Sequence, residues 1–98
     1  MNIQAMMKQA QDLQKKMLKE KEEIDSKVFE GTSSFVTVRM KGNKSLEQIK
    51  IAKEEITKDE IEMLEDMIVV ALNKVMTDID KETEEKMGKY TKGLPGMF

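Results

Sequence analysis

Lysine is the residue type in this sequence that is best placed to bind a ligand through its charge. Five lysines and only two acidic residues fall between positions 8 and 21, a local charge of +3. At about 100° per residue of an α-helix, Lys8, Lys15 and Lys19 lie on roughly one side. A lysine side chain binds phosphate as a flexible point charge, which suits contacts that read no bases. The pattern predicts a phosphate-binding helix face, and it also fits an ordinary solvated face.

Two further groups of basic residues lie elsewhere in the chain. One group, with a tyrosine among it, falls near the C-terminus: Lys86, Lys89, Tyr90 and Lys92. Lysine is also favoured at helix C-termini, an explanation that fits Lys86 best. The other group falls in the middle: Arg39, Lys41, Lys44 and Lys50. Basic residues on an edge strand more often prevent aggregation than bind a ligand. The predicted phosphate contacts are therefore Lys8, Lys15, Lys16, Lys19, Lys89 and Lys92.

The composition argues against catalysis. The chain contains no cysteine and no histidine, which excludes thiol nucleophiles, imidazole bases and Cys/His zinc sites. Its carboxylates match no calcium-loop spacing, and helix capping and solubility explain most of them. We therefore expect no enzyme activity, no metal, no cofactor and no small-molecule substrate. No segment approaches the roughly 20 consecutive apolar residues of a membrane span, and no signal peptide is evident, so we expect a cytoplasmic protein without a membrane partner.

These basic residues must be positioned by two long helices. Apolar residues recur at steps of three and four from position 3 to 17, which predicts a helix over 1–26. A second helix is predicted over 58–87: Thr57 and Glu60 form a capping box, and Gly88 fits the position after the last turn. Residues 88–98 form a tail. Ten methionines lie mostly on the helical stripes, where packing is their simplest role.

Between the helices, residues 27–52 change to the pattern of a three-stranded sheet. Val28 begins a short strand that ends before a Gly31–Ser34 loop, residues 35–40 form a second strand, and residues 46–51 form a third. A two-residue turn at Gly42 would oppose Val38 to Glu47. A four-residue loop over 42–45 instead pairs Val38 with Ile49 and Val36 with Ile51, and we prefer it because apolar matching sets register.

The predicted helices are too long for the predicted sheet to cover. Helices of about 35 and 45 Å exceed what three short strands cover in a compact domain, whose radius of gyration would be near 13 Å. Projecting apolar stripes need a partner, and a second copy is the simplest one. We therefore expect a homodimer of one α+β domain over 1–98, of order α-β-β-β-α, with an antiparallel sheet and projecting arms. Its predicted interface residues are Leu13, Met17, Val36, Val38, Ile68 and Leu72.

Four segments, in matching order, together resemble the YbaB/EbfC family of nucleoid-associated proteins. They are residues 6–17 (MMKQAQDLQKKM), 36–42 (VTVRMKG), 63–73 (MLEDMIVVALN) and 86–98 (KMGKYTKGLPGMF). The ending GLPGMF after a KMG helix terminus is the most distinctive part. The resemblance implies an intertwined homodimer whose strands join into one sheet, with long helices projecting like tweezers.

The same resemblance implies a function. It implies binding of double-stranded DNA with little or no sequence specificity, at the bacterial nucleoid, with an effect on nucleoid organisation or gene regulation. The net charge of −2 by itself gives no attraction to DNA. An assembly factor that grips another protein with methionine-rich helical arms, without DNA binding, is therefore kept as the alternative.

Overall fold

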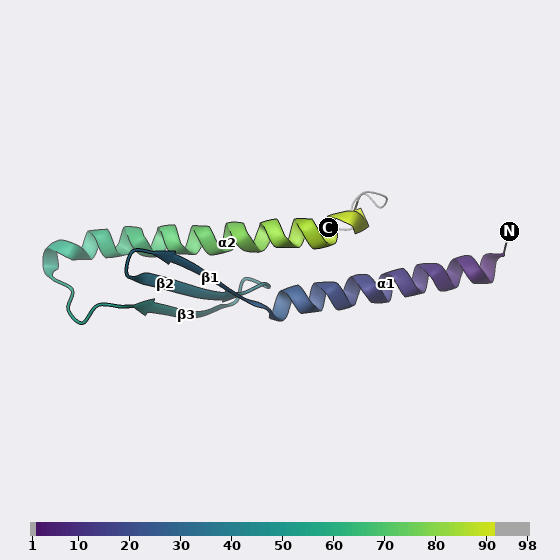
Figure 1. Cartoon of the computed structure of the whole chain (residues 1–98), viewed down its shortest axis with the longest axis horizontal. Helices are drawn as coiled ribbons and strands as arrows, with labels where there is room; N and C mark the ends of the chain where they lie inside the picture. The colour runs from purple at the N-terminus through teal and green to yellow at the C-terminus, as the bar shows by residue number, and fades with distance from the viewer. Residues whose placement is uncertain (1, 92–98) are drawn as a thin grey trace.

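A computed structural model describes residues 2–91 of the chain and shows two long helices flanking a three-stranded antiparallel sheet (Figure 1). The predicted order α-β-β-β-α is confirmed. The elements are α1 Ile3–Ser26, β1 Val28–Ser33, β2 Val36–Lys41, β3 Leu46–Ile51, a 3-10 turn at Lys58–Glu60, and α2 Ile61–Thr91.

The strand order β1-β2-β3 places β2 in the centre. Its pairing with β3 has the register that apolar matching predicted, with Val36 opposite Ile51 and Val38 opposite Ile49. The connecting loop runs over 42–45 as expected, and Lys44 has a positive φ of 68° there. Side chains directly opposite one another point to the same face of a sheet, so all four apolar residues lie on one face.

The predicted end of β1 is wrong. The strand continues through Gly31 and Thr32 to Ser33, and a two-residue turn follows, in which Ser34 has a φ of 52°. Gly31 is needed inside the strand because α2 passes directly over it. A Cβ at this position would lie 2.4 Å from the Ala71 carbonyl oxygen. The glycine therefore marks a close approach of backbones.

The core lies between α2 and the first two strands. Ala71, Val75 and Ile79 of α2 are buried against Val36, Val38 and Met40 of β2. Val36 and Val38 are 0% exposed within this single chain. Their alternation along the strand reflects burial under the subunit's own helix, and their place in a dimer interface stays a prediction.

The predicted projection of the helices is confirmed. The chain measures 72 × 20 × 14 Å and has a radius of gyration of 19.5 Å, well above the value near 13 Å of a compact chain of this length. Most of α1 extends away from the sheet, and the C-terminal part of α2 runs alongside it in the opposite direction (Figure 1). The helix α1 therefore forms an arm that projects from the sheet.

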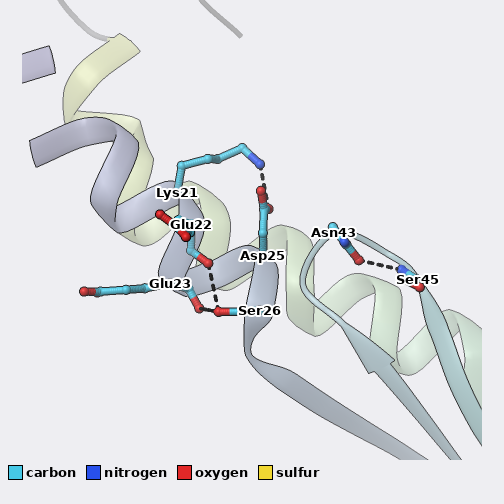
Figure 2. A network of polar contacts seen from close by, with 7 residues as sticks. All are labelled: Lys21, Glu22, Glu23, Asp25, Ser26, Asn43 and Ser45. Atoms are coloured by element: carbon cyan, nitrogen blue, oxygen red, sulfur yellow. Dashed lines mark hydrogen bonds and ion pairs between the residues drawn. The ribbon is translucent and has the colours of Figure 1, made fainter. Parts of the chain in front are cut away.

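The arm is anchored where α1 meets the β2–β3 loop (Figure 2). The Gly42 N–H donates to the Lys27 carbonyl oxygen at 2.9 Å, and the Asn43 N–H donates to the Asp25 carbonyl oxygen at 3.3 Å. The Asn43 side chain accepts a hydrogen bond from the Ser45 N–H at 2.9 Å, which holds the loop in shape. These backbone contacts set the angle between the arm and the sheet.

The second helix differs from the prediction at both ends. The Thr57 N–H donates to the Glu60 carboxylate, as a capping box predicts, and the Thr57 hydroxyl donates to the same carboxylate. The turn that Thr57 caps is 3-10, however, and α2 begins at Ile61. Gly88 does not end the helix, which continues to Thr91. Burial of Met87 and Tyr90 on either side of Gly88 outweighs the roughly 1 kcal/mol that a glycine costs inside a helix.

Candidate functional site

The lysines predicted on the first helix form one exposed row along the arm. Lys8, Lys15 and Lys19 are exposed and fall within about 40° of one another around α1. Met17 and Ile24, which contact α2, lie on the roughly opposite side of the helix. The row therefore faces away from the rest of the chain and is open to a ligand.

Lys16 extends this basic row towards α2. Within residues 2–91, none of Lys8, Lys15, Lys16 and Lys19 forms an ion pair with an acidic side chain. This contrasts with seven other lysines of the described chain that are paired with carboxylates: Lys21, Lys27, Lys41, Lys44, Lys53, Lys86 and Lys89. The charges on the arm thus remain available to external anions, for which phosphate groups are the natural match.

The other predicted lysines have different surroundings. Lys89 Nζ lies 3.3 Å from Glu20 Oε1, so it bridges α2 to α1 where the helices cross. It also lies 5.1 Å above the centre of the Tyr90 ring. Lys92, like the rest of the predicted tail beyond Thr91, lies outside the described residues. The row and Lys89 are therefore not equivalent, because only Lys89 already holds an anion.

The crossing of α1 and α2 is the most constrained polar site near the arm. Ile24, Met87 and Tyr90 form a small buried cluster, and Met17 packs against it. Within the described residues, Glu20 Oε2 and the Tyr90 hydroxyl are both buried and make no direct hydrogen bond. The side chain of Glu20 is 23% exposed, whereas that of its partner Lys89 is 55% exposed.

The charges at this crossing stabilise one another. Burial acts to raise the pKa of Glu20, but the Tyr90 hydroxyl, then Lys89 and Lys16, lower it more, and the net pKa lies below 4.5. The hydrogen bond to Glu20 raises the pKa of Lys89 above 10.5. Burial, followed by the proximity of Glu20, raises the pKa of Tyr90. The site therefore favours an ionised Glu20–Lys89 pair over a broad pH range.

This pairing predicts a pH-dependent contribution to stability. Because the folded-state pKa of Glu20 is lowered, its contribution is complete above 4.5 and disappears as pH falls through the lowered pKa. We expect wild type to be more stable than Glu20→Gln at neutral pH, and the difference in Tm to vanish well below pH 4.5. Thermal unfolding followed by circular dichroism across pH checks this. A difference in Tm that is constant with pH would contradict it.

Most of the basic residues in and around the sheet form ion pairs with carboxylates of the same chain. Arg39 pairs with Glu30 at 3.3 Å and Lys44 with Asp80 at 2.8 Å, so both charges are paired within the chain. Among residues 2–91, no group of three or more acidic side chains is arranged to hold a metal ion, and neither helix is long and apolar enough to span a membrane.

The sequence analysis did not identify Glu20. It was counted only as one of two acids within a basic segment, and its partner lies 69 residues away in sequence. No local pattern signals such a contact. The i,i+4 spacing of Lys16 and Glu20 indicates at most a helix-surface pair.

Comparison with known proteins identifies close relatives across the whole chain. The family model described as the YbaB/EbfC DNA-binding family matches residues 1–94. A nucleoid-associated protein of Ligilactobacillus salivarius is 43% identical over 99% of this chain and 95% of its own length. One from Lactococcus lactis subsp. cremoris is 45% identical over 97% of this chain and 98% of its own length. One from Enterococcus faecalis is 39% identical over 97% of this chain and 93% of its own length.

Proposed function

This chain belongs to the YbaB/EbfC DNA-binding family, and we propose that it binds double-stranded DNA at the nucleoid as a homodimer, through lysine contacts to phosphates. The observation that carries the proposal is the exposed row of Lys8, Lys15 and Lys19 on the projecting arm, with Lys16 beside it. These side chains contact phosphate without reading base edges, so sequence specificity is expected to be low. Binding of this kind serves nucleoid organisation or gene regulation.

A homodimer is proposed because two apolar side chains of β3, Ile49 and Ile51, form a strip on the sheet that α2 leaves uncovered. Val36 and Val38 lie under α2, and their cross-strand neighbours Ile51 and Ile49 share this face of the sheet. However, α2 packs on β1 and β2, and Ile49 and Ile51 remain 39% and 38% exposed. The whole of β3 is exposed, and its outer edge has no neighbouring strand within residues 2–91. A second copy would cover both its face and its edge.

Two residues predicted to lie in the dimer interface flank this strip. On the β1 side, Lys74, Thr77 and Asp78 of α2 line a shallow groove with β1. At about 100° per residue, Leu72 and Ile68 lie on the other flank of α2, towards β3. Both are only partly buried by the subunit's own core. They remain in the proposed interface, together with the exposed Leu13 and the half-buried Met17 on α1.

Placing a charge in the strip should separate the subunits. We expect Ile49→Lys to convert the dimer into a folded monomer of 11.3 kDa, because a lysine buried in an apolar interface without a partner is costly. Sedimentation equilibrium measures the mass, and circular dichroism checks the fold.

Val70→Lys is the matched control for this change. Val70 is a similarly exposed apolar residue on α2, but it faces away from β3. The control should stay dimeric. Dissociation of both variants, or of neither, would contradict the proposed interface.

The exposed apolar side of the arm favours the second candidate function, in which the arm grips another protein. Met6, Met7 and Leu13 are between 49% and 58% exposed. Fluorescence anisotropy of a labelled duplex, titrated with protein at several salt concentrations, separates the two functions. Phosphate contacts give log K that falls with log salt at a slope of about −0.9 per neutralised phosphate. Absence of binding at low salt would overturn the DNA-binding proposal and favour the protein-interaction alternative.

A further inference from the structure

We propose that the crossing of α1 and α2 is a second phosphate-binding site, which the carboxylate of Glu20 occupies in the free protein and a DNA phosphate takes over on binding. The inference rests on the proposed function and adds to it a residue that limits affinity. Its basis is the arrangement of Lys89, Lys16 and Tyr90 around Glu20.

The site has the chemistry of an anion site. Lys89 Nζ donates a hydrogen bond to Glu20 Oε1 at 3.3 Å, and the positive charge of Lys16 also acts on this carboxylate. A carboxylate and a phosphate diester each offer oxygens that share a single negative charge, so the same ammonium groups suit both. Glu20 Oε2 makes no hydrogen bond within the described residues, although it is buried.

The site is continuous with the exposed lysine row. Around α1, Lys16 lies about 40° from Glu20, and Lys19 lies about 100° away on the same side. A duplex that contacts Lys19 and Lys16 is therefore brought towards the crossing. The side chain of Lys89 is 55% exposed and can turn to a phosphate, while Glu20 is held between the helices. Glu20 competes with DNA for Lys89, and no such competitor exists for the row lysines within residues 2–91.

The test is to remove the competing charge while keeping the size of the side chain. We expect Glu20→Gln to bind duplex DNA severalfold more tightly than wild type at low salt. Its salt dependence should steepen by about 0.9 in log–log slope for each Lys89 that is freed. Glu23→Gln is the matched control, because it removes the same charge from an exposed position of α1 that has no ion pair within the described residues. The control should leave the slope unchanged.

Lys89→Met supplies a second, independent variant. In wild type this change should lower the affinity only modestly, because the phosphate contact of Lys89 forms there at the cost of its ion pair with Glu20. In the Glu20→Gln background it should abolish the gain in affinity and in slope. Equal behaviour of Glu20→Gln and Glu23→Gln would overturn the inference, as would a gain that survives Lys89→Met.

Failure of this inference is distinguishable from failure of the proposed function. If wild type binds DNA with a steep salt dependence and Glu20→Gln matches the control, only the second site is wrong. If wild type shows no salt-dependent binding, DNA binding itself is wrong. Circular dichroism of each variant verifies that its helices remain folded.

Discussion

We expect replacement of Lys15, Lys16 and Lys19 with glutamate to lower DNA affinity by about a hundredfold or more. A charge-assisted contact contributes on the order of 1 kcal/mol or more, so the loss of three contacts costs about 3 kcal/mol, which is about a hundredfold in Kd. The three new carboxylates add repulsion from the phosphates. All three lysines are exposed and form no ion pair within 4 Å in the described residues, so the fold and the proposed dimer should persist. Anisotropy titrations and sedimentation measure the two properties separately.

A triple variant with the same change in net charge is the control. Lys58, Lys74 and Lys81 are exposed, and all three lie outside α1 and β3. Their replacement by glutamate should weaken DNA binding far less, because screening limits the reach of distant charges to about 10 Å at moderate salt. Equal losses in the two triple variants would show that net charge alone matters, and would contradict the assignment of the arm as the DNA-binding surface.

Gly42→Ala destabilises the protein by about 3 kcal/mol, through a steric clash at the base of the arm. A Cβ at Gly42 would lie 1.8 Å from the Ile24 carbonyl oxygen and 2.6 Å from its carbonyl carbon. These are backbone atoms near the end of α1, and Ile24 is itself buried, so neither side can move away cheaply. The β2–β3 loop must separate from α1, which also loosens the hydrogen bond from the Gly42 N–H to Lys27. Urea unfolding measures the loss.

Gly88→Ala is the matched control and should have the opposite sign. Gly88 lies inside α2, and a Cβ there would meet no heavy atom within 4 Å. Alanine in a helix interior is favoured over glycine by about 0.5–1 kcal/mol, so this variant should be more stable than wild type. Hydrogen exchange at residues 24–27 should accelerate in Gly42→Ala only. Similar unfolding midpoints for the two variants would contradict the close packing of the β2–β3 loop on the end of α1.

Local patterns were sufficient to predict the elements and the sheet register. The spacing of apolar residues predicted both helices, and the matching of Val36 with Ile51 and Val38 with Ile49 selected the four-residue loop that is observed. The helix lengths alone also predicted a projecting arm. Each of these properties depends on residues that are near one another in sequence or on strands joined by a short loop. Propensity, periodicity and turn chemistry act at this range.

The crossing of α1 over α2 was decided by the tertiary structure alone. It pairs Lys89 with Glu20 across 69 residues, buries Met87 and Tyr90 so that α2 continues through Gly88, and leaves the row lysines exposed. Packing of α2 on the sheet likewise buries Val36 and Val38 and requires glycine at position 31. The sequence thus determined which lysines lie on the arm. Only the crossing determined that Lys89, among the predicted phosphate-binding lysines, already pairs with a carboxylate. Side-chain contacts between distant elements depend on packing geometry and not on sequence spacing.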